Sequence, residues 1–208
     1  TLERWHEPAS VERAVRAARQ AGIEDVNLDL IFAIPGEDRA MLDRDLDALL
    51  ALEPTHLACY SLIFEPGTPL TQKQQLGRIQ PVEDDEAGAM YEQVIDRLEA
   101  AGFEHYEISN WARRSRAHDY RCDHNLLYWT HGNWLGAGPS AASHVAGHRW
   151  KSEPHLGHYL AASPAPPLAE AEVLTEQQQF AERLMLGLRL RDGLSLAWLK
   201  EAVGPTDG

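Results

Sequence analysis

Cysteine is scarce in this sequence, and Cys59 and Cys122 are the only two among 208 residues. Two cysteines do not make a disulfide scaffold, so we expect a reducing compartment, the cytoplasm. No run of 18 or more apolar residues occurs, and we therefore expect no transmembrane helix. The first ten residues have the pattern of neither a signal peptide nor an amphipathic transit peptide.

Positive charge is also in short supply. The chain has 19 lysines and arginines against 32 aspartates and glutamates, which gives a formal net charge of -13. A surface of this charge repels phosphate groups, so we expect neither nucleic acid nor an anionic membrane as a general partner. The remaining composition, 44% hydrophobic and 25% charged, is typical of a globular protein with a substantial core.

Several catalytic motifs are missing as well. No Gly-x-Gly-x-x-Gly follows an expected strand, which argues against a dinucleotide-binding fold. No nucleophile elbow occurs, so acyl-transfer hydrolysis has little support. Seven of the ten histidines lie between residues 118 and 158, and His144 and His148 have the spacing of a metal pair on a helix. Gly147 argues against a helix there, but a zinc hydrolase that uses this cluster remains one alternative.

The first half of the chain alternates between helices and strands. We predict helices over residues 10–21 (with Ser10 as N-cap), 38–52 and 82–101, and strands over 25–32, 55–62 and 103–109. Residues 71–81 look irregular and exposed. Short, even alternation of this kind predicts βαβ units and a parallel sheet, either an open doubly wound sheet or part of a (β/α) barrel.

The pattern changes after residue 143. We expect a strand at residues 147–150, a short helix at 154–162, a linker at 163–167, and helices at 175–190 and 193–202. We therefore predict a first domain over residues 1–162 and the start of a second, mostly helical domain over 163–208. This second piece is too short for a core of its own, so we expect it to be cut off.

The stretch from Tyr120 to Ser143 is unusually rich in aromatic and imidazole side chains. Its glycines and proline break a helical pattern, so we predict loop and short strands. Such side chains suit a flat, partly apolar ligand that contains a metal or an aromatic ring. The alternative is a buried aromatic cluster that closes the end of a barrel.

Asp29 is an acid in the middle of a predicted strand, on the same face as Asn27 and Ile31. A carboxylate inside a barrel is unfavourable unless it meets a hydrogen-bonding partner or a cationic ligand. Two interpretations remain open: a cofactor ligand, or a salt bridge to a neighbouring strand.

Six short motifs, in this order, carry a resemblance to a known family, and the set covers nearly the whole chain. They are Asn27–Ile31, Ile34–Gly36, Glu65–Pro69, Tyr106–Asn110, His124–Trp129 and Leu135–Gly138. In this order they resemble the radical S-adenosylmethionine family of the oxygen-independent coproporphyrinogen III oxidases. Within that family the match is closest to the haem chaperones of the HemW type, because His-Asn-x-x-Tyr-Trp at 124–129 is typical of that branch.

The resemblance implies a fold, two ligands and their residues. The family has a partial (β/α) barrel followed by a small helical domain, and it binds S-adenosylmethionine and a [4Fe–4S] cluster at the carboxyl ends of the strands. By position in the motifs, Asp29, Ile63 and Ala142 would line S-adenosylmethionine. His124 would ligate haem iron, with Tyr128 and Trp129 shaping the pocket. Many chaperone relatives have histidine where this chain has Ala142.

The family's Cys-x-x-x-Cys-x-x-Cys motif is absent from this sequence. Cluster irons need cysteine thiolates, so we expect a cluster only in a longer parent protein of which this chain is a piece, and no catalytic residue in the chain itself. The leading hypothesis is a chaperone that delivers haem to acceptor proteins, and contact with a membrane is expected only through such an acceptor. The alternative from the same resemblance is oxidative decarboxylation of coproporphyrinogen III.

Overall fold

The computed structural model describes residues 7–162, 164 and 167–203. The chain forms two compact units, one that ends at Arg121 and one that starts at Cys122, and each is described by itself. The domain boundary predicted between residues 162 and 163 thus falls inside the second unit. Of the predicted linker, residues 163, 165 and 166 lie outside the described part. No helix in the described ranges is long and apolar enough to span a bilayer.

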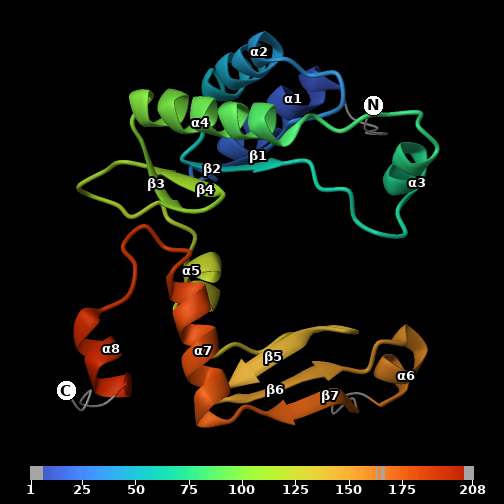
Figure 1. The fold of residues 1–208 in the computed structure, drawn as a ribbon, viewed down its shortest axis with the longest axis vertical. Coiled ribbons are helices and arrows are strands. Elements are labelled where there is room, and N and C mark those ends of the chain that lie inside the picture. The colour runs from blue at the N-terminus through green and yellow to red at the C-terminus, as the bar shows by residue number, and fades with distance from the viewer. Residues whose placement is uncertain (1–6, 163, 165–166, 204–208) are drawn as a thin grey trace. The chain divides into compact units, whose positions relative to one another are not determined.

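The first unit is built on a four-stranded sheet (Figure 1). The strands are β1 (Asn27–Phe32), β2 (His56–Ser61), β3 (Phe103–Glu107) and β4 (Asn110–Arg113), in the order β1-β2-β4-β3. β1 and β2 are parallel, as predicted, but β4 is antiparallel to both of its neighbours. The α/β class is confirmed, the prediction of an all-parallel sheet is wrong, and the partial barrel stays a prediction.

The sheet is mixed because the chain turns back at Ile108 and Ser109. The predicted strand over 103–109 ends at Glu107, and Asn110 begins a further strand, β4. Two residues are enough to join antiparallel strands, whereas a parallel connection needs a long crossover. The backbone N–H of Cys59 donates to the Ser109 carbonyl at 2.8 Å, and this bond ties the turn to β2.

Three helices cover one face of this sheet: α1 (Pro8–Gln20), α2 (Arg39–Leu50) and α4 (Asp84–Ala100) (Figure 1). Asp38 caps α2 by accepting from the Met41 N–H at 2.7 Å. The N-cap of α1 is Glu7, so the prediction of Ser10 as cap is wrong, because Pro8 already starts the helix. A further helix, α3 (Pro69–Gln75), forms in the stretch predicted to be irregular, with Thr68 as its cap.

Buried and exposed side chains along β1 show which face of the sheet packs against the hydrophobic core. Leu28 and Phe32 are buried against the helices, whereas Asn27 and Asp29 are exposed on the opposite face, as the sequence predicts. The other fully buried residues of this core are Leu42, Leu46, Leu57, Cys59, Met90, Val94, Leu98, Phe103 and Trp111. The face of the sheet opposite the three helices therefore carries the polar side chains of β1.

The second unit has a three-stranded antiparallel sheet. Its strands are β5 (Ala142–Val145), β6 (His148–Ser152) and β7 (Leu168–Val173), and its helices are α5 (Asp123–Trp129), α6 (Leu156–Ala161), α7 (Glu176–Gly187) and α8 (Leu196–Val203). β7 pairs with β6 although it follows the predicted domain boundary, so the described residues after that boundary contain one strand as well as the helices α7 and α8. Helix α7 begins with a capping box in which Thr175 and Gln178 satisfy each other's backbone N–H groups.

Helix α5 corrects the prediction of loop and short strands for Tyr120–Ser143. The residues that break a helix begin only at Gly132, so the seven residues of α5 are free to form two turns. The helix ends at Trp129, and His131 follows with a φ of 57°. The remainder of the stretch is irregular until β5, as predicted.

Candidate functional site

A row of polar side chains crosses the open face of the first unit's sheet. The Asn27 amide N–H donates to Asp29 at 2.7 Å, and its oxygen lies 2.6 Å from His56 Nδ1. The other nitrogen of this imidazole, Nε2, lies 2.8 Å from the Tyr106 hydroxyl. Ala112 pairs with His56 across β4, and its small side chain leaves room for this bond. The row therefore holds the Asp29 carboxylate in place at one end.

His56 is the buried centre of this row. Burial lowers the pKa of its imidazole, against the weaker opposite effect of the Asp29 carboxylate. The neutral form is thus favoured in the folded protein, and one ring nitrogen accepts a hydrogen bond while the other donates one. No local pattern in the sequence indicates a role for His56 or Tyr106, because their contact joins residues fifty positions apart.

We expect the free energy of unfolding to fall as the pH is lowered below about 6.5, the ordinary pKa of histidine. The unfolded chain takes up a proton at His56 in this range while the folded chain resists it, so the stabilisation present above pH 6.5 is lost toward the lower folded pKa. Urea unfolding from pH 7.5 to 5 measures the slope. His56→Gln should flatten it, and His118→Gln, at an exposed site, should not; equal slopes in all three proteins would refute the assignment.

Ile63 lies at the carboxyl edge of the same sheet. It follows β2 by two residues and is 67% exposed. The Leu62 N–H donates to the Phe32 carbonyl at 2.8 Å, so Ile63 lies directly after the last hydrogen bond between the ends of β1 and β2. An exposed isoleucine there is suited to contact with the apolar part of a ligand. Of the predicted S-adenosylmethionine residues, the first unit thus holds Asp29 and Ile63, whereas Ala142 is the first residue of β5 in the second unit.

An iron–sulfur cluster does not match the described residues. Cluster irons are held by thiolates, but burial raises the pKa of the Cys59 thiol to about 12, so this group stays protonated and inert. Cys122 is the N-cap of α5. Within the described ranges there is also no group of three or more histidine, cysteine, aspartate or glutamate residues that could hold a metal ion.

His124 lies in the first turn of α5, and its side chain is exposed. The Tyr128 ring, one helical turn later, packs edge-on against it with 4.8 Å between ring centroids. Tyr128 in turn contacts Trp134 at 4.6 Å. Trp129 lies under the Arg189 guanidinium, 4.3 Å from its ring centroid. The three residues of the His-Asn-x-x-Tyr-Trp motif therefore share one short helix, and the histidine is accessible to a large ligand.

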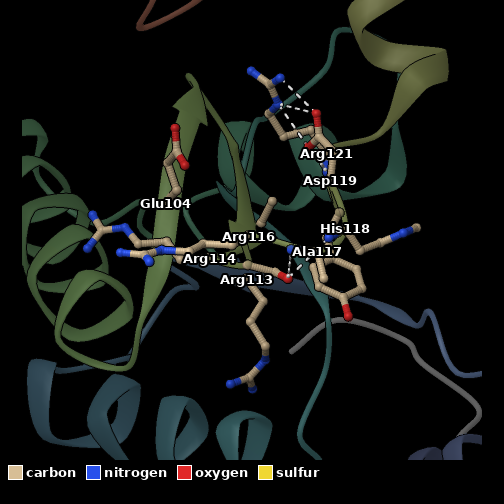
Figure 2. Close-up of a pocket in the computed structure, with 11 residues that line it drawn as sticks. Glu104, Arg113, Arg114, Arg116, Ala117, His118, Asp119 and Arg121 are labelled. Atoms are coloured by element: carbon tan, nitrogen blue, oxygen red, sulfur yellow. Dashed lines mark hydrogen bonds and ion pairs between the residues drawn. The ribbon is translucent and has the colours of Figure 1, made fainter.

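A cavity of the first unit lies beside the loop that follows β4 (Figure 2). It has a volume of about 390 Å³, and its basic lining residues are Arg113, Arg114, Arg116 and Arg121. Figure 2 shows Arg113 and Arg121 directed to opposite sides. Arg121 binds Asp119 at 2.8 Å, and Arg113 donates to the Pro54 carbonyl at 3.2 Å. Because these charges do not converge on one point, we assign no anion to this cavity.

Comparison with known proteins supplies the family. No family model matches the sequence. The haem chaperone HemW of Mycobacterium tuberculosis (strain CDC 1551 / Oshkosh) is 39% identical over 204 residues, which are 97% of this chain and 51% of the relative. HemW of Lactococcus lactis is 34% identical over 193 residues, 93% of this chain and 50% of the relative. The family resemblance is confirmed: this chain is related to the HemW proteins.

A comparison with solved structures shows a shared fold. The solved structure of HemN, the radical S-adenosylmethionine coproporphyrinogen III oxidase of Escherichia coli, matches 96% of this chain and 48% of its own with a TM-score of 0.74. Its sequence is only 16% identical, so this likeness shows the fold alone. The chain spans about half the length of the curated HemW relatives described above. The activity and partners of those whole proteins therefore enter only as proposals for this chain.

Proposed function

We propose that this chain binds haem and S-adenosylmethionine as part of a haem chaperone, which passes haem to acceptor proteins in the cytoplasm. The observation that carries the proposal is the exposed His124 imidazole on α5, in a chain related to proteins named haem chaperones. An imidazole is a good axial ligand for haem iron. The aromatic rings of Tyr128 and Trp129 supply apolar surface beside it for a flat macrocycle.

Residues of α5 would hold the haem through an iron–imidazole bond and a contact between aromatic rings. His124 would bind the iron through one ring nitrogen, while the T-shaped contact with Tyr128 fixes the orientation of the ring. Because His124 is exposed, an acceptor protein can reach the iron and replace this ligand. A chaperone must release its cargo as well as bind it, and an exposed ligand on a short helix favours release.

Replacing His124 by alanine should shift the Soret band of the haem complex and weaken haem binding. Little stability should be lost, because the His124 side chain is exposed and substitutions at such sites usually change stability by less than about 0.5 kcal/mol. Titration of the chain with haem, followed by absorbance, measures both spectrum and affinity, and a melting curve measures stability. His148→Ala is the matched control, since His148 is also exposed in the same unit.

Two outcomes of this titration would count against His124. If His124→Ala binds haem with unchanged spectrum and affinity, another residue ligates the iron. If His124→Ala instead lowers the melting temperature strongly, the histidine has a structural role that its exposure does not show. An equal effect of His148→Ala would mean that haem binds surface histidines without selectivity.

S-adenosylmethionine carries a positively charged sulfonium and a polar adenosine, and the open face of the first unit offers matching groups. Asp29 would supply a carboxylate that the Asn27 amide already orients, and Ile63 would supply apolar contact. By its place in the family's motifs, Ala142 is the third residue that we propose for this cofactor. When bound together with a cluster, this cofactor supplies radical chemistry, and the family implies both. Since the cluster does not match the described residues, we propose binding and no radical step for this chain.

Asp29→Ala should weaken S-adenosylmethionine binding by roughly ten-fold or more, because loss of a charge-assisted hydrogen bond amounts to about 1.5–3 kcal/mol. Isothermal titration calorimetry measures the affinity. Asp25→Ala is a suitable control, since Asp25 is an exposed acid just before the same strand. Unchanged affinity in Asp29→Ala would make the carboxylate a structural partner of Asn27 only.

The alternative, decarboxylation of coproporphyrinogen III, has weaker support. It rests on the likeness to HemN, which shows the fold alone at 16% identity. The relatives that share a third or more of their residues with this chain over nearly its whole length are named haem chaperones. The chaperone hypothesis is therefore preferred.

A further inference from the structure

A cavity of about 400 Å³ lies within the second unit, next to helix α5, which carries the His-Asn-x-x-Tyr-Trp motif. Its lining residues come from α5, the segment after it, β5, β6 and α7, and they are Tyr128, Trp129, His131, Trp134, His144, Arg149, Glu182, Met185 and Leu186. The volume is within the range of small-molecule sites, and aromatic walls with a few polar groups are typical of such sites. The cavity contains two histidines, and the spacing in the sequence drew attention to His144 but not to His131.

His144 is held in one tautomer. Its Nδ1 lies 2.8 Å from the Gly132 carbonyl oxygen, which can only accept, so Nδ1 carries the proton. Nε2 is then left with a lone pair. It is buried, and no described residue donates a hydrogen bond to it. The side chain is only 3% exposed, and two backbone bonds to Trp134, at 2.8 and 3.0 Å, fix its strand. A neutral imidazole oriented through its other nitrogen is the usual state of a histidine metal ligand.

His131 offers a second buried nitrogen without a hydrogen-bond partner among the described residues. Burial, together with the neighbouring His144, lowers the pKa of His131, which favours the neutral form of its ring. The nearest acid is Glu182, 3.6 Å away, and Arg149 already binds that carboxylate at 2.7 Å. His131 also has a left-handed backbone conformation, which is strained for a residue with a Cβ atom. Such strain is often found where a side chain is held for binding.

The two rings are too close together to bind the two opposite faces of the same iron. A metal–imidazole bond of about 2 Å puts two nitrogens on opposite faces of one iron about 4 Å apart, and the ring centroids farther apart still. The centroids of His131 and His144 are 4.7 Å apart. Of the two, His144 has the fixed tautomer with a free lone pair.

We propose that this cavity receives the iron of a haem, with His144 Nε2 as an axial ligand. The inference rests on the proposed haem-binding function and adds a buried ligand to the exposed His124. A continuous row of rings joins the two, from His124 to Tyr128, Trp134 and His144, with centroids 4.6 to 4.9 Å apart. The exposed histidine is then the point of exchange with acceptors, and the buried one retains the haem between exchanges.

The test compares haem titrations of the full chain with those of His144→Gln. Glutamine keeps an N–H that can donate to the Gly132 carbonyl but is a poor iron ligand. We expect a changed Soret band and a loss of affinity at least as large as the roughly ten- to hundred-fold that loss of a ligand's hydrogen-bond partner causes in metal sites. Wild-type spectrum and affinity in His144→Gln would overturn the inference and leave the proposed function intact. No saturable binding by the wild type would overturn both.

A second variant guards against misfolding of His144→Gln. Met185 lines the cavity but is 61% exposed, so Met185→Trp can fill the space without disturbing the core. Leu188→Trp, at an exposed position of the same helix end that does not line the cavity, is the matched control. We expect weaker haem binding in Met185→Trp alone. Wild-type haem binding by both variants would contradict occupancy of the cavity by haem.

Discussion

Replacing Trp111 by alanine should lower the free energy of unfolding by about 3–5 kcal/mol. The Trp111 ring is completely buried in the first unit, stacked on His105 at 4.3 Å between centroids, with Tyr91 edge-on at 6.4 Å. The cavity left by the substitution would lie between β4 and α4, where the fully buried Met90, Val94 and Leu98 cannot easily move to fill it. Urea unfolding followed by circular dichroism measures the change.

Trp111→Phe separates the effect of volume from that of the indole N–H. The Trp111 Nε1 atom is buried and has no hydrogen-bond partner within the described part of the chain. Removal of an unpaired donor forfeits no hydrogen bond, so Trp111→Phe should be much less destabilising than Trp111→Ala. If the two variants lose equal stability, the ring does not fill the core in the way described.

Asn110→Ala should be the second most destabilising change, at about 1–3 kcal/mol. Glu107 is 1% exposed, and the Asn110 amide donates a hydrogen bond to it across the β3–β4 turn. Without this donor, a buried carboxyl group is left with less compensation for its lost hydration. Equilibrium unfolding of the variant measures the effect.

A double-mutant cycle with Glu107→Gln tests the cause. Glutamine still accepts a hydrogen bond but carries no charge, so Asn110→Ala should be less damaging in this background. Residues in direct contact typically show coupling of about 0.5–3 kcal/mol in such cycles. Strict additivity of the two changes would mean that Asn110 stabilises the turn through its backbone position and not through Glu107.

Local patterns in the sequence predicted those parts of the fold that depend on interactions between residues close in the sequence. The alternation in β1 placed Leu28 and Phe32 in the core and Asp29 on the open face, as observed. The hairpin was missed because Glu107 to Asn110 contains no glycine or proline to indicate a turn. Its cause is tertiary: the Ser109 carbonyl bonds to Cys59 on another strand.

For the candidate sites too, the sequence indicated which region is involved but not which residues meet through tertiary contacts. The histidine-rich region between residues 118 and 158 was visible in the sequence, but the spacing drew attention to His144 and His148. The structure instead brings His144 next to His131, because the Trp134 backbone pairs with His144 and folds the intervening loop back. No periodicity expresses such a pairing. The row from Asp29 to Tyr106 likewise joins three different strands, and residue types alone do not reveal their register.

The stoichiometry of haem binding by the wild-type chain tests the central claim most directly. The chain has ten histidines, so unselective binding to surface imidazoles would give a gradual rise in absorbance without an end point. We expect a sharp end point at one haem per chain and a Soret band typical of histidine-ligated iron. When an excess of apomyoglobin is added, the Soret band should move to the position typical of a globin. A titration without saturation, or a spectrum equal to that of free haem, would contradict it.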